Sequence, residues 1–223
     1  MIGTHNESSL HRELKNLYAG QGGQTEVDAV GFVADCISPS GEYVEVQTGN
    51  FGSLRKKAKE LTRLNALKIV FPVIINKYIE VSDGEGNRLY RRKSPRRGTP
   101  WEVFDELIHA PELPLLKNIT LEIVLVDAEE RRVSDGKGSW RRKGVSIHDR
   151  RILALCDTIR LAKPKDYLRF VPFKKGEEFT SATLGEITSI GSSLAGKTLY
   201  VLNRLGVVKK VGKKGKSYLY RIV

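Results

Sequence analysis

Residues 42–75, EYVEVQTGNFGSLRKKAKELTRLNALKIVFPVII, decide the fold that the sequence predicts. The segment begins with an alternating run typical of a half-buried strand, breaks at Gly-Asn-Phe-Gly, and continues with apolar residues at helical spacing. It ends in a nearly continuous apolar run, of the kind that is buried on both faces of a sheet. A strand, a helix and a buried strand in this order predict an α/β fold.

The flanking segments extend this pattern. Apolar residues recur at helical spacing over residues 6–18, and residues 27–33 form a mostly apolar run that indicates a strand. Turn residues at 38–41 separate that run from the strand at 42–48, so the two strands are expected to pair antiparallel. Downstream, the pattern predicts a hairpin about residues 83–87, a short helix at 100–108 and a strand at 119–126.

The second half of the chain predicts a separate unit. Residues 127–151 are dense in charge and poor in apolar residues, so we expect a mobile or DNA-facing connection there, followed by a helix at 150–161. Residues 180–223 have the pattern of two short helices and a terminal hairpin. We therefore expect one domain over residues 1–135 and a smaller one over residues 136–223.

Composition excludes several protein classes. No apolar stretch reaches the roughly 18–20 residues that span a bilayer, and the N-terminal residues lack the apolar core of a signal peptide, so a cytoplasmic location without membrane contact is expected. Cys36 and Cys156 are far apart and belong to no metal-binding spacing, which argues against a disulfide framework and a zinc site.

The charge balance points to a polyanionic partner. Lys and Arg number 38 against 26 Asp and Glu in the 223 residues, for a net charge of +12. Residues 88–98 and 203–223 carry many of these cations and no acid, and clustered cations gain free energy by releasing counterions from a polyphosphate. DNA is the expected partner, RNA is an open alternative, and a merely solvated basic surface is the simplest rival interpretation.

Two carboxylates are candidate metal ligands. Glu45 and Gln47 project from the same face of their strand because side chains alternate. If the strand at 27–33 pairs with it, Asp28 can approach Glu45, and the two acids would repel unless a cation lay between them. Mg²⁺ suits such a site because it takes a few carboxylate, carbonyl and water oxygens, and Mn²⁺ could replace it.

This arrangement resembles the PD-(D/E)xK nuclease superfamily, over roughly residues 6–75. The order helix, hairpin, helix, strand is similar, Asp28 matches the first acid, and Glu45-x-Gln47 matches the second motif with Gln in place of Lys. Glu13 is similar to the additional acid of the Holliday-junction-resolvase-like branch. The resemblance implies a restriction-endonuclease-like mixed sheet flanked by helices, and metal-dependent hydrolysis of phosphodiester bonds.

The replacement of Lys by Gln departs from the family pattern. Gln47 can orient a water molecule by hydrogen bonding but supplies no positive charge. Lys56 or Lys57, near the start of the following helix, could supply the charge from another backbone position, and we rank Lys56 slightly ahead.

The C-terminal segment resembles a winged helix-turn-helix. Residues 192–204 would be the recognition helix, and the loop about residue 215 would be the wing; an interaction with protein instead of DNA is the alternative. The cations expected to contact nucleic acid are Lys197 and Arg204 on that helix, Lys213, Lys214 and Lys216 in the wing, and Arg91, Arg92, Lys93, Arg96 and Arg97 in the basic loop.

Together these features predict a Mg²⁺-dependent DNA endonuclease targeted by a winged helix. Two alternatives remain: a non-catalytic DNA-binding protein or regulator on a nuclease-like scaffold, and an RNA-processing nuclease. Cleavage of both strands would favour a symmetric homodimer.

Overall fold

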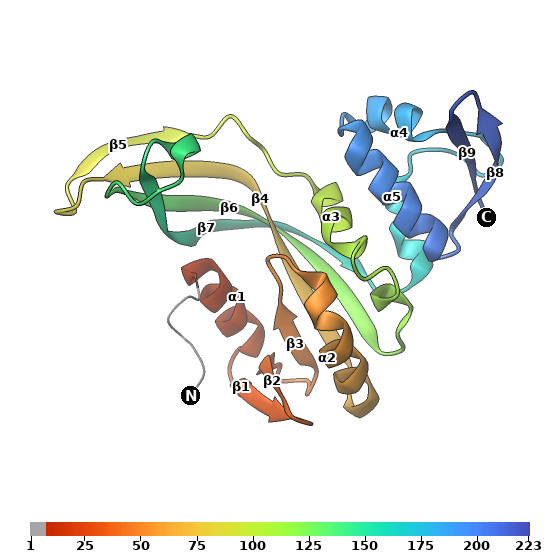
Figure 1. Cartoon of the computed structure of the whole chain (residues 1–223). Helices are drawn as coiled ribbons and strands as arrows, with labels where there is room; N and C mark the ends of the chain where they lie inside the picture. Colours follow the sequence, from red (N-terminus) through yellow and green to blue (C-terminus); the bar gives the residue numbers. More distant parts are fainter. Residues whose placement is uncertain (1–7) are drawn as a thin grey trace.

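The computed structural model describes residues 8–223 and has an α/β architecture, in which helices flank a mixed sheet of parallel and antiparallel strands (Figure 1). This confirms the predicted fold class. The elements in chain order are α1 (Ser9–Ala19), β1 (Gln24–Ala29), β2 (Phe32–Ile37), β3 (Tyr43–Val46), α2 (Phe51–Leu64), β4 (Leu67–Ser82), β5 (Arg88–Lys93), α3 (Val103–Leu107), β6 (Ile119–Ser134), β7 (Val145–Leu161), α4 (Ser181–Thr188), α5 (Ser192–Arg204), β8 (Val208–Lys214) and β9 (Ser217–Ile222). The part of the predicted first helix that precedes Ser8 lies outside the described residues.

Seven strands form the main sheet within residues 8–223, in the order β1-β2-β3-β4-β6-β7, and β5 also pairs with β4. The strands β3, β4 and β6 are parallel, and the remaining neighbours are antiparallel. The parallel centre corresponds to the segment at 42–75, whose helix α2 makes the crossover from β3 to β4, as a parallel connection requires.

Two apolar clusters lie on the two faces of the sheet. On one face, α1 packs through Leu10 and Leu14 against a cluster that includes Val44, Val46 and Val70. On the other face, α2 and α3 pack on alternate residues of β4 and β6. Because successive strand residues point to opposite faces, both faces of β4 are apolar, which explains its nearly continuous hydrophobic run.

The prediction of one strand over residues 27–33 is wrong, because the chain reverses inside that run. Val30 and Gly31 have φ of 47° and 77° and form a two-residue turn between β1 and β2. Such turns need positive φ at both positions, where a β-branched residue such as Val is rare, so residue preference gave no turn signal at Val30. The extra hairpin makes β2, and not β1, the neighbour of β3.

A connection lies within residues 127–151 as expected, but it covers only residues 135–144, because β6 continues to Ser134. The helix expected at 150–161 is wrong: these residues belong to β7, which pairs with β6 along its length. Pairing with a long neighbouring strand outweighs the helical spacing of a few apolar residues. Because β7 belongs to the main sheet, this sheet continues past the domain boundary expected at residues 135/136.

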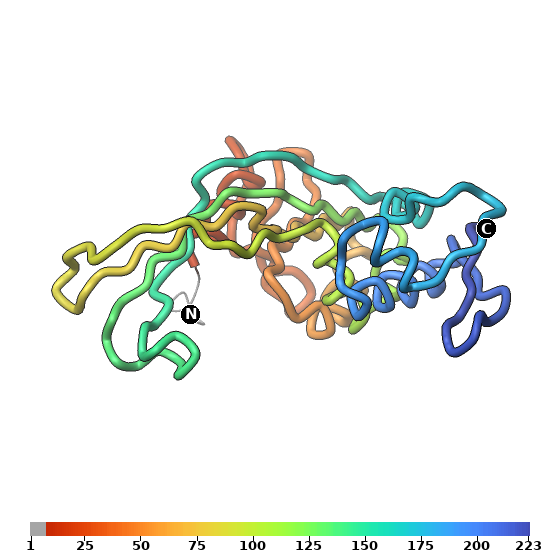
Figure 2. Tube along the Cα trace, turned by 90° about the horizontal axis from the view of Figure 1, so that it is seen from above, coloured from red at the N-terminus to blue at the C-terminus, as the bar shows by residue number. Residues whose placement is uncertain are grey.

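The outer parts of four strands form an extended arm. The strands β4, β6 and β7 are 16, 16 and 17 residues long, and the β4–β5 hairpin and the β6–β7 connection project from the body in Figure 2. The sheet therefore extends well beyond the part that α1 and α2 cover on its two faces.

The C-terminal residues form the predicted two helices and hairpin, at the end of the molecule opposite the arm (Figure 2). Their apolar side chains are continuous with the core around α3. Lys197 on α5 donates to Asp105 on α3, with 2.7 Å between Nζ and Oδ1. No helix among residues 8–223 is both long enough and apolar enough to cross a membrane.

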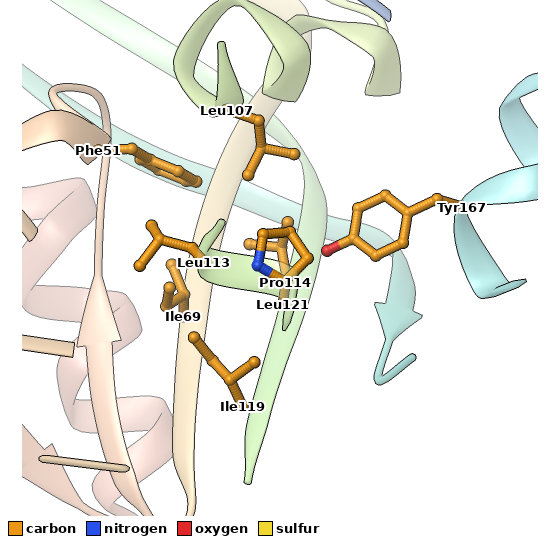
Figure 3. A pocket seen from close by; sticks show the side chains of 8 residues that line it. All are labelled: Phe51, Ile69, Leu107, Leu113, Pro114, Ile119, Leu121 and Tyr167. Atoms are coloured by element: carbon orange, nitrogen blue, oxygen red, sulfur yellow. The ribbon is translucent and has the colours of Figure 1, made fainter. Parts of the chain in front are cut away.

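A small apolar cavity lies within this core (Figure 3). Phe51, Ile69, Leu107 and Leu121 are among the side chains that line it, and its volume is about 10 Å³. The Tyr167 hydroxyl, which belongs to a buried side chain at this cavity, has no hydrogen-bond partner within the described part of the chain.

Candidate functional site

The strands β2 and β3 separate at a point where two acidic side chains lie. Their register consists of Ile37 opposite Tyr43 and Cys36 opposite Val44. The next residues, Asp35 and Glu45, no longer form a backbone pair. A strand pair that opens in this way leaves backbone N–H groups that need other acceptors.

The two carboxylates supply those acceptors. The Asp35 N–H donates to Glu45 Oε1 at 3.2 Å, and the Val46 N–H donates to Asp35 Oδ2 at 2.8 Å. Each side chain therefore binds the backbone of the other strand. The reciprocal bonds hold both carboxylates in the gap between the strands.

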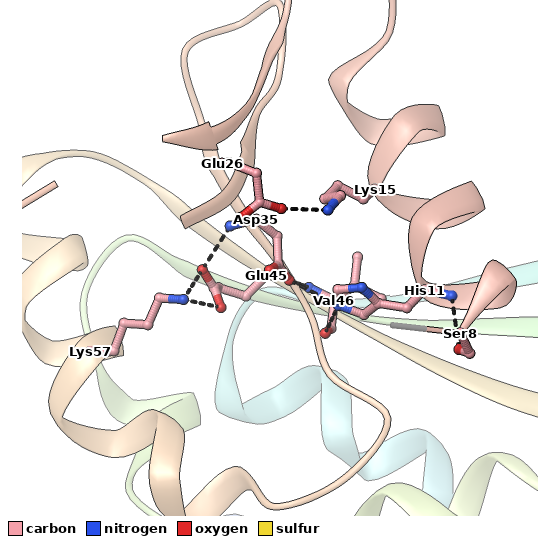
Figure 4. A network of polar contacts seen from close by, with 8 residues as sticks. All are labelled: Ser8, His11, Lys15, Glu26, Asp35, Glu45, Val46 and Lys57. Atoms are coloured by element: carbon pink, nitrogen blue, oxygen red, sulfur yellow. Dashed lines mark hydrogen bonds and ion pairs between the residues drawn. The ribbon is translucent and has the colours of Figure 1, made fainter. Parts of the chain in front are cut away.

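Lys57 contacts this pair from α2 (Figure 4). Its Nζ lies 2.6 Å from the Glu45 carboxylate. Lys57 follows Phe51, the buried first residue of α2, by about one and a half helical turns. The Glu45 side chain is 1% exposed and that of Lys57 is 19% exposed, so the ion pair is largely shielded from water.

His11 contacts the pair from α1, on the opposite side in Figure 4. Its Nε2 lies 3.2 Å from Asp35 Oδ2 and 2.9 Å from the Val46 carbonyl oxygen. A protonated Nε2 can donate to both acceptors. Asp35 is thus held by a backbone N–H on one side and an imidazole on the other.

Burial and mutual repulsion separate the two acids electrostatically. Burial, together with the charge of Asp35, raises the pKa of Glu45 to about 7, although Lys57 opposes the shift. The pKa of Asp35 is lowered: its burial acts in the opposite direction, but hydrogen bonds from His11 and Val46 outweigh it. At neutral pH the site therefore holds one fixed carboxylate and one near its midpoint of titration, which favours the approach of a cation.

The donor set fits a hard divalent cation with few protein ligands. Within residues 8–223, no three His, Cys, Asp or Glu side chains converge as a metal-binding group. Asp35, Glu45 and the Val46 carbonyl provide oxygen atoms at one place, and Mg²⁺ is commonly bound by one or two carboxylates with water completing its shell. The chemistry of these donors suits Mg²⁺ or Mn²⁺ better than zinc.

The expected meeting of Asp28 with Glu45 is wrong. Asp28 lies on β1 and pairs with Val33 of β2. The whole of β2 therefore separates Asp28 from β3. Asp28 is also exposed. Asp35 occupies the position on the neighbouring strand that the sequence interpretation gave to Asp28.

Of the other predicted site residues, Glu45 lies at the centre of the site, whereas Glu13, Gln47 and Lys56 have other surroundings. Glu13, on α1, instead accepts a hydrogen bond from the Ile152 N–H of β7 at 2.8 Å, so it fixes α1 to the sheet. Gln47 follows β3 directly, where its backbone N–H donates to Val70 at 2.8 Å, and Lys56 is exposed on α2 while Lys57 faces Glu45.

Asp35 and His11 belong to the site but were not predicted from the sequence. Asp35 would have followed from a turn at Gly31, because a hairpin there puts the residues after it beside the strand at 42–48. His11 shares a helix with Glu13, but their side chains point in different directions, as a spacing of two residues on a helix requires. No spacing signal in one sequence links His11 to residues 35–46.

The predicted nucleic-acid contacts are exposed except for the half-buried Lys197, and two of them bind acidic side chains. Arg91 binds the buried Glu129, with Nε 3.0 Å from Oε1, and lies over the Tyr78 ring. Lys197 is paired with Asp105 and faces α3. The remaining predicted cations are classed as exposed: Arg92, Lys93, Arg96, Arg97, Arg204, Lys213, Lys214 and Lys216.

Comparison with known proteins places the chain in a family. A family described as "Domain of unknown function (DUF8091)" matches residues 8–162. The chain belongs to this family. The DUF8091 match runs from α1 to the end of β7 and so contains the whole main sheet with the Asp35–Glu45 site.

One relative extends over both parts of the chain. An "Uncharacterized protein" of Treponema pallidum (strain Nichols) is 30% identical over 221 residues, which are 99% of this chain and 87% of the relative. No solved structure matches the chain significantly. The match continues through the residues that follow the DUF8091 segment.

Proposed function

We propose that this protein is a divalent-metal-dependent nuclease that hydrolyses phosphodiester bonds in DNA. The observation that carries the proposal is the buried contact of Asp35 with Glu45, between strands that separate at that point. The two carboxylates replace backbone acceptors in the sheet, and ionisable groups with shifted pKa values of this kind are common at functional sites. The PD-(D/E)xK resemblance supports the same chemistry, with Asp35 in the role first given to Asp28.

The chain's own groups have separate roles in this proposal. Asp35 and Glu45 would hold Mg²⁺ or Mn²⁺ with the Val46 carbonyl oxygen. Lys57 would supply the positive charge that Gln47 lacks, since its ammonium group already lies against Glu45. His11 would fix the orientation of Asp35 through the bond between Nε2 and Oδ2.

A bound Mg²⁺ would orient water and neutralise charge that develops on the phosphate. Lys57 would add a positive charge beside Glu45, since its ammonium group lies 2.6 Å from that carboxylate. Such fixed charges stabilise a developing negative charge without reorganisation. Burial of Glu45 strengthens these interactions, because they act in a region from which water is largely excluded.

DNA is the proposed substrate because of the charge of the chain. The net charge is +12, and exposed cations lie on β5, in the loop that follows β5, and on the β8–β9 hairpin. On that hairpin, Lys210 and Lys213 lie 4.1 and 5.1 Å from the centroid of the Tyr218 ring. We propose that the C-terminal helices and hairpin act as a winged helix whose wing contacts phosphates; the pairing of Lys197 with Asp105 leaves the hairpin as the freer part.

A cleavage assay tests the proposal. Purified protein is incubated with supercoiled plasmid, linear duplex, single-stranded DNA and RNA, each with Mg²⁺, Mn²⁺ or EDTA. Wild type and Asp28→Asn should cut DNA with metal, while Asp35→Asn and Glu45→Gln should lose cutting by at least about a hundredfold. Asp28→Asn is the matched control because it removes an exposed acid from the strand one position further out.

The two alternatives give different results in the same assay. Binding of DNA without cutting in any metal would support a non-catalytic DNA-binding protein. Cutting of RNA but not of DNA would support an RNA-processing nuclease.

A further inference from the structure

In the described part of the chain, the edge of β4 that faces β3 and β5 pairs with no strand in the gap between them, although the Gly98 N–H of the loop after β5 donates there to the Ile74 carbonyl oxygen at 3.0 Å. β3 pairs with β4 only as far as Val70, and β5 begins to pair at Tyr78. Within residues 8–223, no strand pairs with this edge of β4 between those two positions. Pro72 lies in this gap, where the missing N–H of proline breaks no ladder bond.

A hollow of about 300 Å³ occupies this gap. It reaches from the end of β3 to the loop that follows β5, and cations from three different segments line it. The lining residues include Thr48, Pro72, Lys77, Arg96 and Arg150.

The cations of this hollow exceed the acids that could neutralise them. Glu130, on β6, is 1% exposed and lies 3.6 Å from Lys77 Nζ, 2.8 Å from Arg150 Nε and 2.5 Å from Arg132 Nη2. Lys77 and Arg150 line the hollow, whereas Arg132 does not. Together with Arg96 they are three cations against the carboxylates of Glu130 and Glu102, which also lines the hollow, so one positive charge is in excess. Arg96 is 79% exposed and lies 3.6 Å from the Glu102 carboxylate.

Glu130 also holds these cations in place. Its buried carboxylate binds Lys77 and Arg150, and the side chains of these two residues remain 22% and 44% exposed. Because their positions are fixed in the absence of a ligand, less side-chain entropy is lost when an anion binds. A guanidinium group can also bind a phosphate with two parallel hydrogen bonds.

The hollow lies next to the Asp35–Glu45 site. Thr48 lines the hollow and is three residues from Glu45, so at most about 11 Å separates their Cα atoms. This upper limit is short enough for neighbouring phosphates of one strand to reach both places. One strand could therefore contact the acid pair and the hollow at the same time.

We infer that the hollow between the end of β3 and the loop after β5 binds a backbone phosphate of a nucleic-acid strand. The neighbouring phosphodiester of the same strand would lie at Asp35 and Glu45. The inference rests on the proposed function for the identity of this strand. The hollow acts as a positioning site: its cations fix the strand through phosphate and do not read sequence.

The test measures binding without metal, so that cleavage cannot contribute. Fluorescence anisotropy follows a labelled 20-nucleotide single strand and a 20-base-pair duplex in EDTA at several salt concentrations. Lys77→Gln, Arg150→Gln and Arg96→Gln should each weaken binding about fivefold near 0.1 M salt and reduce the salt slope by about 0.7 to 0.9. The control is Arg63→Gln, an equally charged change on exposed α2, which should alter affinity by less than about twofold.

Two further variants separate a local effect from misfolding. Arg96→Gln leaves the Glu130 cluster intact, so its effect holds even if Lys77→Gln or Arg150→Gln destabilises the protein. Glu102→Gln removes the acid beside Arg96 and should strengthen binding. Unchanged affinity and slope in Arg96→Gln and in folded Arg150→Gln would overturn the inference.

The outcomes distinguish this inference from the proposed function. If wild type never cuts DNA but the three variants still lose affinity, the phosphate site stands and the nuclease proposal fails. If wild type cuts and the variants bind normally, the nuclease proposal stands and the phosphate site fails. Inorganic phosphate should displace the strand better from wild type than chloride does at equal ionic strength, and an equal effect of the two salts would also overturn the inference.

Discussion

Asp35 and Glu45 each bind the backbone of the other's strand, through N–H groups of Asp35 and Val46 at 3.2 and 2.8 Å. Both side chains take the place of backbone acceptors at the point where β2 and β3 separate. The acids are therefore components of the sheet as well as candidates for chemistry. Loss of either carboxylate affects local structure and the charge of the site together, so neutral isosteres are the appropriate variants.

Glu45→Gln should gain stability relative to wild type as pH rises. The ordinary pKa of 4.5 is raised to about 7 in the folded protein, mainly by burial. Between those values the unfolded chain releases a proton that the folded chain keeps, so wild-type stability falls with pH and then levels off above about 7. Denaturant unfolding from pH 4.5 to 8 should show a difference on the order of 3 kcal/mol that develops over this range in favour of the variant. A constant difference at all pH values would contradict the shift.

Lys57→Met should move the pH dependence of cutting upward, because Lys57 lowers the pKa of Glu45. Removal of an opposite charge at hydrogen-bond distance should raise that pKa by about one unit or more. The acidic limb of the pH-rate profile should shift by the same amount, and Lys57→Arg should restore most of it. The neighbouring change Lys56→Met is the control, since Lys56 is exposed; a profile that shifts with Lys56 and not with Lys57 would reverse the assignment.

Glu130→Gln should make the arm less stable at neutral pH and remove part of its sensitivity to acid. The pKa of Glu130 is lowered: burial acts in the opposite direction, but bonds from Arg150 and Arg132 outweigh it. Its stabilising effect is therefore present above the ordinary value of 4.5 and is lost as pH falls through the lower folded pKa. Hydrogen exchange of the β6–β7 amides should show reduced protection in the variant at pH 7, by up to about 3 kcal/mol. Equal protection in both proteins would show that the cluster adds nothing to the arm.

Tyr167→Phe should raise stability. The hydroxyl is buried without a partner at an apolar cavity of about 10 Å³, and burial raises the pKa of Tyr167. Removing an unsatisfied polar group should add about 1 kcal/mol, seen as a higher midpoint of thermal unfolding. A lower midpoint would mean that the hydroxyl has a water partner, since the cavity is about the size that one molecule needs.

The strand, helix and buried strand at 42–75 could be predicted, because each has a distinct apolar period, whereas the parallel pairing of the two strands is a finding of the structure. The turn at Val30–Gly31 escaped prediction because Val rarely adopts positive φ, and that single turn decides whether Asp28 or Asp35 meets Glu45. The strand β7 escaped because its pairing with β6 is a long-range interaction that local spacing does not report. Glu45 was predicted from alternation within one strand, whereas the contacts of His11 and Lys57 depend on how helices on opposite faces are placed.

Binding of Mn²⁺ tests the central claim most directly, because it depends on neither substrate nor cleavage. Isothermal titration calorimetry at pH 7.5 should find one Mn²⁺ ion per chain in wild type and in Asp28→Asn, and at least about tenfold weaker binding in Asp35→Asn and Glu45→Gln. Mn²⁺ should also stabilise wild type against heat and leave Asp35→Asn unaffected. Equal binding by Asp35→Asn and wild type, or binding lost in Asp28→Asn, would contradict the assignment of Asp35 and Glu45 as the acid pair.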